Sequence, residues 1–363
     1  MIILEVNMTI DQFEKMLIDI AKKGVKEYHL TPGAKPFIRE HGLISEVSEA
    51  EVVSLEYMNR LVASILSKED QVQLYADGAF ETAYSIENIG RFRIRFGRQR
   101  SSLTLVIFIK STSIPSVKDL KIPESVIGKM NGSSGLLIVT GETKSNKTTT
   151  IASLLSEGSK IRPRIVTTVE NPIDYLLSHG KGIVNQMEVG VDIKSTAKGI
   201  KEAINNHSDI IYISDVQTKE EWQLVFDALE KGFFVIVSMN SRGIEAAIDH
   251  MLFLFNKDEQ PFVKRLLAHH LNAFLYEVNV EMLDGKTAAV YEVLLNNKAV
   301  RNMFLENKLK QLPEIFKSFP KTEMRSMDMA LADYVKSGLI DRDLAISRSH
   351  DKSDFMKLLN GVK

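Results

Sequence analysis

Residues 133–155 read SSGLLIVTGETKSNKTTTIASLL, and this stretch decides the fold of the second half of the chain. The run GLLIVT is almost wholly apolar, as expected of a buried β-strand. Gly141 then opens a polar loop, after which apolar residues recur at helical spacing, at Ile151, Leu154 and Leu155. The stretch therefore predicts a strand, a tight loop and a helix in direct succession.

The loop matches most of the phosphate-binding pattern Gly-x-x-x-x-Gly-Lys-Ser/Thr, with Asn146 in place of the second glycine. In that pattern backbone N–H groups converge on an anion, the lysine bridges the β- and γ-phosphates, and the hydroxyl group binds Mg²⁺. Asparagine tolerates a positive φ, so we expect the loop to close around phosphate at a cost of ~1 kcal/mol. The candidate nucleotide-binding residues are Gly141, Thr143, Lys144, Ser145, Asn146, Lys147, Thr148 and Thr149. The alternative is an ordinary surface loop, which the flanking strand and helix disfavour.

Apolar runs continue beyond the loop. RIVTTVE, SDIIYIS and FFVIVSMN are separated by helical patterns, which is typical of a parallel sheet covered by helices on both faces. From Gln260 onward the apolar spacing is helical, apart from an apparent hairpin around Asp284–Gly285. We therefore expect an α/β domain at 125–363 with a helical C-terminal part.

The chain before the loop has a mixed pattern. Apolar residues from Ile10 to Ile20 recur at helical spacing after Thr9, a candidate N-cap, and a second helical pattern runs from Ser54 to Leu66. The stretch FETAYSIENIGRFRIRFGRQRSSLTLVIFIK alternates apolar and polar residues, which predicts two or three antiparallel strands.

The turns between these strands are predicted at Glu87–Asn88 and at Gly97. We expect an N-terminal α+β domain at 1–112. A linker at 113–124 follows, since its prolines favour an extended connection.

Composition limits the classes of protein that fit. The chain has 363 residues, long enough for two domains, with 46 basic and 47 acidic side chains. This balance gives no general attraction for nucleic acid. The absence of cysteine excludes disulfides and thiolate metal sites. No uncharged apolar run approaches the ~20 residues of a membrane span, and the N-terminus has no signal-peptide core, so we expect no direct membrane insertion.

The loop and its surroundings resemble the secretion-superfamily ATPases, and among them the PilT/PilU type IV pilus retraction motors, whose loop runs Gly-Pro-Thr-Gly-Ser-Gly-Lys-Ser-Thr-Thr. The likeness continues in VKEYHLTPGAKPFIREHG and GRFRIRFGRQR of the N-terminal half. It implies an N-terminal α+β (PAS-like) domain followed by a RecA-like P-loop ATPase domain with a helical C-terminal region. A further match is to the retraction motif Ala-Ile-Arg-Asn-Leu-Ile-Arg-Glu, and the residues that track it are Ala299, Val300, Arg301, Asn302, Met303, Phe304, Leu305 and Glu306.

The resemblance assigns roles to two carboxylates. The family's Glu-Asp-Pro-Ile-Glu segment corresponds to ENPID, so Glu170 is its water-orienting or Mg²⁺-shell carboxylate. The family's Gly-Glu-Met-Arg-Asp segment corresponds to SDVQT, so Asp215 stands where the family has a longer glutamate. Withdrawing a catalytic carboxylate by ~1 Å can cost on the order of 100-fold in rate.

Other family positions are also altered. Phe233 and Asn240 stand where the family has histidines on the γ-phosphate side of the site. Arg93 matches one of two arginines that close over the phosphates and is the arginine-finger candidate, whereas the second falls near Ile107 or Phe108. These changes favour nucleotide binding with weak or lost hydrolysis, and a fully active retraction motor is the alternative.

The resemblance also implies partners and a location. It implies ATP and Mg²⁺ as ligands, with Mg²⁺ bound through Thr148. It further implies a homohexamer, or a hexamer mixed with a paralogous pilus ATPase, that acts on an inner-membrane platform protein from the bacterial cytoplasm. The arginines of GRFRIRFGRQR could instead bind nucleic acid, but no aromatic platform repeats beside them, so a nucleotide- or subunit-facing role is favoured.

Overall fold

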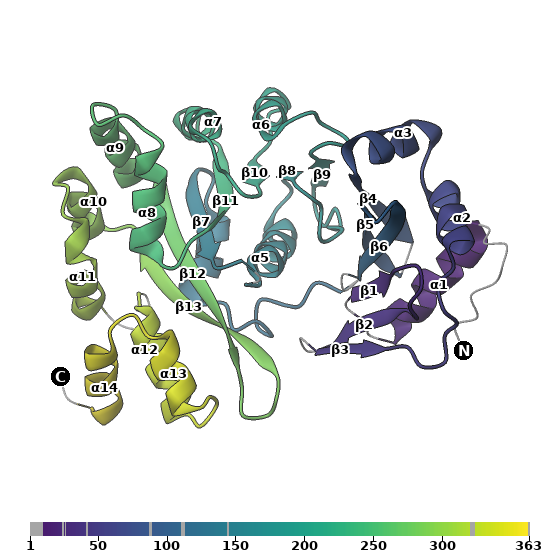
Figure 1. Cartoon of the computed structure of the whole chain (residues 1–363). Helices are drawn as coiled ribbons and strands as arrows, with labels where there is room; N and C mark the ends of the chain where they lie inside the picture. Colours follow the sequence, from purple (N-terminus) through teal and green to yellow (C-terminus); the bar gives the residue numbers. More distant parts are fainter. Residues whose placement is uncertain are drawn as a thin grey trace. The chain divides into compact units, whose positions relative to one another are not determined.

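The structure is a computed structural model of the whole chain (Figure 1). It describes residues 10–23, 25, 27–40, 43–86, 89–109, 113–143, 145–319 and 324–361. The chain forms two compact units. The first comprises residues 1–113 with 174–176, and the second comprises 114–173 with 177–363.

The first unit is an α+β fold with one six-stranded sheet in the order β3-β2-β1-β6-β5-β4. All neighbouring strands of this sheet pair antiparallel. Its elements are α1 (Ile10–Lys22), β1 (Glu27–Leu30), β2 (Phe37–Glu40), β3 (Leu43–Glu46), α2 (Leu55–Ile65), α3 (Lys68–Asp77), β4 (Ala79–Ile86), β5 (Gly90–Gln99) and β6 (Ser102–Ile109).

Helix α1 confirms the predicted apolar face, since Phe13, Leu17 and Ile20 are buried against the sheet residues of the same core. The candidate cap Thr9 lies outside the described residues. Helix α2 also begins and ends as predicted, because the Ser54 side chain accepts a hydrogen bond from the Tyr57 backbone N–H.

The prediction of a turn at Gly97 is wrong. Gly97 lies inside β5 and pairs with Thr104 of β6. The chain turns instead at Arg100 and Ser101, whose φ values of 45° and 62° are those of a two-residue hairpin loop. This turn was missed because two non-glycine residues adopt the left-handed conformation. The other predicted turn, Glu87–Asn88, lies outside the described residues.

The second unit is an α/β fold. Its first elements are α4 (Glu124–Ile127), η1 (Gly128–Asn131), β7 (Gly135–Gly141), α5 (Lys147–Ile161), β8 (Ile165–Glu170), β9 (Ile183–Glu188), α6 (Thr196–Asn205), β10 (Ile210–Ile213), α7 (Lys219–Glu230) and β11 (Phe234–Asn240). Then follow α8 (Ile244–Phe253), α9 (Gln260–His270), β12 (Leu271–Glu281), β13 (Thr287–Leu295), α10 (Lys298–Leu305), η2 (Leu309–Gln311), α11 (Leu312–Ser318), α12 (Met327–Lys336), α13 (Arg342–Arg348) and α14 (Lys352–Asn360).

The seven strands of this unit run in the order β13-β12-β7-β11-β10-β8-β9. Strands β12 to β9 are parallel, as the apolar runs predict, and β13 returns antiparallel as the predicted hairpin partner of β12. Alternate side chains of β7 point to opposite faces of the sheet. Leu136 and Ile138 are buried in the hydrophobic core on one face, whereas Leu137 and Val139 are buried in the core on the other. The sheet is therefore covered on both sides.

Part of the predicted linker packs onto this second unit. Val117 and Ile122 are buried in the same core as Ile151 and Leu154 of α5. Ser153 of α5 also donates a hydrogen bond to the backbone oxygen of Pro115, at 2.6 Å. These residues are thus held by α5 rather than standing free of it.

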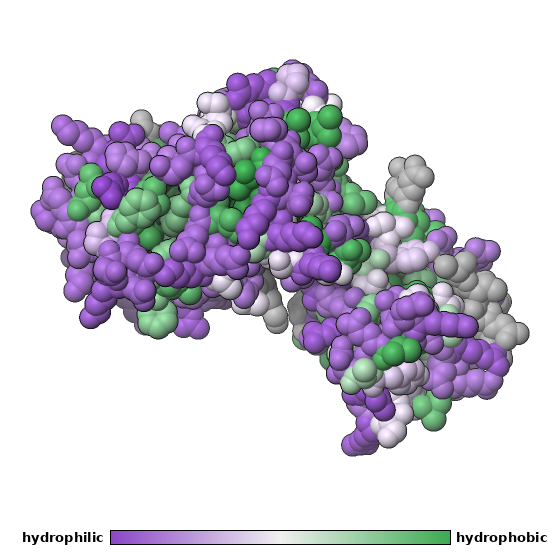
Figure 2. Space-filling view, turned by 90° about the horizontal axis from the view of Figure 1, so that it is seen from above, coloured by the Kyte–Doolittle hydropathy of each residue, from purple (hydrophilic) through white to green (hydrophobic). Residues whose placement is uncertain are grey.

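The surface of the described residues is mixed in hydropathy, as Figure 2 shows for one face. Large exposed apolar side chains include Phe253 at the end of α8, Phe262 in α9 and Leu305 in α10. Within the part of the chain that the structure describes, no helix is long and apolar enough to cross a membrane.

Candidate functional site

The loop between β7 and α5 is tightly built around Gly141. A Cβ at this position would lie 2.5 Å from Ser145 Oγ and 2.7 Å from the backbone oxygen of Glu277 on β12, so only glycine fits. The Gly141 oxygen accepts from the backbone N–H of Ser241, at 3.1 Å. Of the candidate residues, Thr143 is exposed and Lys144 lies outside the described residues.

Asn146 is the N-cap of α5, with a φ of −86°. The tolerance of asparagine for a positive φ is therefore not used here, since the backbone at this position has a negative φ. The Asn146 side chain makes no capping hydrogen bond. The N-terminal end of α5, which includes Thr148 and Thr149, thus directly follows the loop without a side-chain cap from Asn146, and such a helix end favours an anion.

Lys147 begins α5 and folds back over the loop. Its Nζ donates to the backbone oxygens of Gly141 and Glu142, at 3.1 and 2.9 Å, and to Ser145 Oγ at 3.1 Å. Burial lowers the pKa of this ammonium, and the negative charges of Glu277 and Asp215 oppose the shift. A partly buried cation whose donors rest on neutral oxygens can transfer them to a phosphate, so the residues fit a polyphosphate ligand.

Asp215 follows β10 and lies at the same edge of the sheet as the loop. Its backbone has a φ of 54°, the left-handed region that is strained for a residue with a side chain. Both carboxylate oxygens already have amide donors: Oδ1 accepts from Asn240 Nδ2 at 3.1 Å, and Oδ2 accepts from Gln217 Nε2. The structure therefore brings Asp215 and Asn240 together, close enough to Lys147 to influence its charge.

Glu170 is the last residue of β8 and is buried. Its Oε1 accepts from Thr168 Oγ1 at 2.7 Å and from Gln186 Nε2 at 3.0 Å. Glu170 thus ends a neighbouring strand of the parallel sheet, with at least one oxygen engaged by protein donors.

Phe233 does not join this group, so the placement expected for it is wrong. It immediately precedes β11, and its backbone oxygen accepts from the Gly135 N–H at the start of β7. Asn240 ends β11, where it pairs with Gly141. Because a strand advances about 3.3 Å per residue, Phe233 lies at the opposite edge of the sheet, about 20 Å from the loop.

Arg93 belongs to the first unit. It lies on the polar face of β5, where its Nε is 3.1 Å from Glu81 Oε1 and its guanidinium stacks over the Phe108 ring at 5.0 Å. The neighbouring Phe92 and Ile94 are buried, as the predicted alternation requires. In this structure Arg93 is therefore held by groups of its own sheet.

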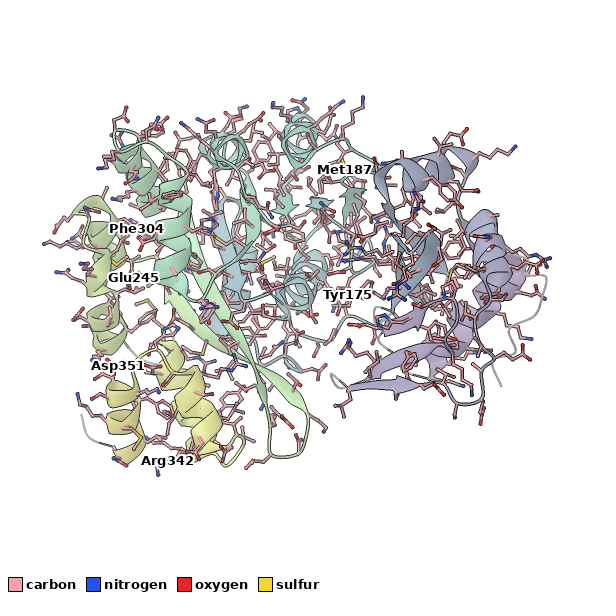
Figure 3. The ribbon with its side chains drawn as sticks, viewed as in Figure 1. Tyr175, Met187, Glu245, Phe304, Arg342 and Asp351 are labelled. Atoms are coloured by element: carbon pink, nitrogen blue, oxygen red, sulfur yellow. The ribbon has the colours of Figure 1, made fainter. Side chains whose placement is uncertain are left out.

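The predicted retraction motif forms α10. The Asn297 side chain caps it by accepting from the Val300 N–H at 3.0 Å. Val300, Met303 and Phe304 are buried, and Phe304 is labelled in Figure 3. The other motif residues are exposed, namely Ala299, Arg301, Asn302, Leu305 and Glu306. The helix thus presents a mixed polar face to solvent.

Sequence reasoning missed Glu277, a fully buried carboxyl group on β12. It pairs in register with Gly141, and its Oε2 accepts from Thr150 Oγ1 of α5 at 2.6 Å. Burial raises its pKa to about 7, while Thr150, Lys147 and Ser145 oppose the shift. The available signal was a lone acidic residue inside the apolar run FLYEVNV.

Glu142 connects the loop with two exposed arginines. Its carboxylate lies 3.4 Å from Arg242 Nε and 3.7 Å from Arg348 Nη1 at the end of α13. Arg242 also lines a cavity of about 1090 Å³ beside α8, whose lining includes Glu245 and Asp351, both labelled in Figure 3. The C-terminal helices thus touch the loop through charges at the surface.

Comparison with known proteins agrees with this geometry. Residues 118–271 match the family model described as Type II/IV secretion system protein. The chain is 28% identical to a twitching motility protein of Neisseria gonorrhoeae over 87% of this chain and 84% of that protein. It is 26% identical to the type IV pilus ATPase PilU of Pseudomonas aeruginosa over 96% and 91% of the two chains.

Among solved structures, the pilus retraction motor PilT with bound ADP superposes with a TM-score of 0.87 at 28% identity, covering 96% of this chain and 98% of that one. The fold and the loop are similar to those of P-loop ATPases of the type II/IV secretion class. Within that class, the chain is similar over nearly its whole length to the PilT/PilU-like type IV pilus retraction ATPases. The N-terminal unit, the ATPase unit and the helical C-terminal region all correspond to that fold.

Proposed function

We propose that this chain is a motor-type subunit for type IV pilus retraction that binds nucleotide and hydrolyses it weakly or not at all. The observation that carries the proposal is Lys147, a partly buried ammonium held between β7 and α5 with its donors on replaceable oxygens. The relative with bound ADP supports a nucleotide as the ligand.

The roles of the loop residues follow from their chemistry. The α5 N-terminus and Lys147 would hold the β- and γ-phosphates, with Gly141 allowing the close approach of backbone that the loop requires. The Thr148 hydroxyl would bind Mg²⁺, which when present supplies charge neutralisation of the phosphates. Thr143, Lys144, Ser145 and Thr149 complete the proposed set.

The state of the carboxylates supports weak hydrolysis. Asp215 is held by the amides of Gln217 and Asn240, and Glu170 accepts from Thr168 and Gln186. Water or Mg²⁺ must compete with these donors for the carboxylate oxygens. Since phosphoryl transfer depends almost wholly on positioning and charge, such competition lowers the rate. Arg93, the proposed arginine finger, would also have to leave Glu81.

A fully active motor is the second candidate. The observation in its favour is that Glu170 and Asp215 both persist, at the end of β8 and directly after β10, which are adjacent strands of the parallel sheet. Their amide contacts could then be replaced when nucleotide binds, as Lys147 must exchange its own partners.

The proposed assembly is a homohexamer, or a hexamer shared with a paralogous pilus ATPase, in the bacterial cytoplasm. It would act on the inner-membrane platform protein of the pilus without entering the membrane or binding nucleic acid. The exposed side of α10 is the proposed retraction element, and 1–112, 113–124 and 125–363 are the proposed N-terminal domain, linker and ATPase domain.

A thermal shift measurement tests nucleotide binding. A ligand that binds only the folded state stabilises it by RT ln(1 + [L]/Kd), so a non-hydrolysable ATP analogue with Mg²⁺ should raise the melting temperature. The Lys147→Ala variant should show a much smaller rise. If the melting temperature of the wild type does not change at millimolar analogue, the proposal of nucleotide binding is contradicted.

A further inference from the structure

The buried carboxyl group of Glu277 lies against the phosphate loop but belongs to none of the roles assigned above. Glu277 is fully buried in β12, directly beside Gly141 in the parallel register. Strand β12 comes so close to the loop that the backbone oxygen of Glu277 excludes any side chain at Gly141. Glu277 is therefore in direct contact with the loop, so a change in the charge of its carboxyl group acts on the loop directly.

The two oxygens of this carboxyl group are unequal. Oε2 accepts from Thr150 Oγ1 at 2.6 Å, and the same hydroxyl lies 3.2 Å from the Tyr291 hydroxyl of β13. Oε1 is buried and accepts no hydrogen bond of good geometry among the residues that the structure describes, although the Ser145 hydroxyl is near enough to favour the ionised form. A buried oxygen without a donor stabilises an ionised carboxylate poorly, so the site suits a carboxyl group that carries a proton.

Titratable and charged groups from several elements surround Glu277. Lys147 of α5 is the cation that stabilises its ionised form, and Tyr291 of β13 faces it from the other side. Arg325 and Tyr334 lie beyond Tyr291 and act on it, whereas Asp215 acts on Lys147. The ionised form of Glu277 is thus stabilised by the Thr150 hydroxyl, by the charge of Lys147 and by Ser145, and Lys147 is the cation that is proposed to bind phosphate.

We propose that Glu277 is a positioning residue of the phosphate loop, and that nucleotide binding is coupled to the uptake of a proton by its carboxyl group. This inference rests on the proposed nucleotide binding. An ionised Glu277 attracts Lys147 and repels an arriving polyphosphate. A protonated Glu277 does neither, so the lysine is free to bind the phosphates.

The sign of the pH dependence follows from linkage. Phosphate charges beside Glu277, together with the loss of Lys147 to the ligand, raise the carboxyl pKa further in the bound state. The bound state therefore holds more protons than the free state over the interval between the two pKa values. Nucleotide affinity should fall as pH rises through that interval, by at most about tenfold per pH unit for one proton.

The experiment measures the affinity of a fluorescent ADP analogue from pH 6 to 8.5 at fixed Mg²⁺ and ionic strength. Wild type is compared with Glu277→Gln, and Glu281→Gln is the matched control, since Glu281 is exposed at the end of the same strand. The ionisation of the nucleotide itself is common to all three proteins, so it cancels in the ratios. The wild type and Glu281→Gln should lose affinity relative to Glu277→Gln as pH rises.

The outcomes separate this inference from the proposed function. Binding by all three proteins with parallel pH profiles overturns the role of Glu277 and leaves nucleotide binding intact. No binding by any protein at any pH, with folding confirmed by circular dichroism, overturns both. Should Glu277→Gln fail to fold, Thr150→Val is measured instead. It removes the donor to Oε2, so the decline in affinity should move to higher pH, and an unmoved decline contradicts the inference.

Discussion

Lys147 and Asp215 lie at the same edge of one sheet, yet their surroundings differ. The Lys147 ammonium rests on backbone oxygens and one serine hydroxyl, all neutral acceptors that a phosphate can replace. The Asp215 carboxylate is held by Asn240 and Gln217, two side-chain amides. The proposed phosphate-binding lysine thus donates to acceptors that a ligand can replace, whereas the proposed catalytic carboxylate already accepts hydrogen bonds from two protein amides.

The largest effect is expected from removing the lysine. Lys147→Ala deletes the charge-assisted hydrogen bonds to the phosphates, and we expect affinity for the ADP analogue to fall about 1000-fold, equivalent to ~4 kcal/mol. Titration of the fluorescent analogue measures it. An affinity within a factor of three of the wild type would show that Lys147 does not contact the nucleotide.

The next largest effect concerns Glu277 and the stability of the ligand-free protein. Its folded pKa of about 7 is raised above the unfolded value of 4.5. The stabilisation is therefore fully present below pH 4.5 and is lost as pH rises toward 7. The loss amounts to about 3 kcal/mol of unfolding free energy at 1.36 kcal/mol per pKa unit.

Denaturant unfolding of the wild type and of Glu277→Gln at several pH values between 5 and 8 measures this loss. The amide variant cannot ionise, so its stability relative to the wild type should rise with pH over this range. A constant difference between the two proteins would contradict the buried, proton-bearing carboxyl group.

The contrast between Asn240 and Phe233 gives a third test. The double variant Asp215→Glu, Asn240→His lengthens the carboxylate and removes its amide partner, so phosphate release should rise about 100-fold if these two positions limit hydrolysis. Phe233→His is the matched control. It lies at the far edge of the sheet and should leave the rate unchanged, whereas an equal rise in both proteins would argue against the placement of Phe233.

The smallest effect is expected at Glu142. Its pairs with Arg242 and Arg348 involve exposed side chains, and such pairs contribute about 0–1 kcal/mol. Glu142→Gln should therefore change the melting temperature by only a few degrees, and less at high salt. A larger change in differential scanning fluorimetry would mean that the C-terminal helices depend on the loop for their stability.

Local sequence patterns predicted much of this molecule. The strand before Gly141, the helix after it and the apolar strands that follow were all readable, because each signal lies within a few residues of chain. The contacts that distinguish the site could not be predicted from local sequence patterns. Asn240 donates a hydrogen bond to Asp215, and Thr150 donates one to Glu277, only because the strand order places segments that are distant in sequence side by side.

Two other errors have physical reasons. Phe233 and Asn240 were assigned to one side of the site, but a strand separates their positions by its full length. The turn after β5 was placed at Gly97, because glycine is the usual residue for a left-handed backbone, whereas Arg100 and Ser101 adopt that conformation here.

Phosphate release by the purified wild-type protein with Mg²⁺ and ATP, measured beside Lys147→Ala, tests the central claim most directly. Nucleotide binding of the wild type is determined on the same preparation. The account predicts saturable binding with phosphate release close to that of the variant. Rapid release by the wild type that Lys147→Ala abolishes would contradict it and establish the active motor instead.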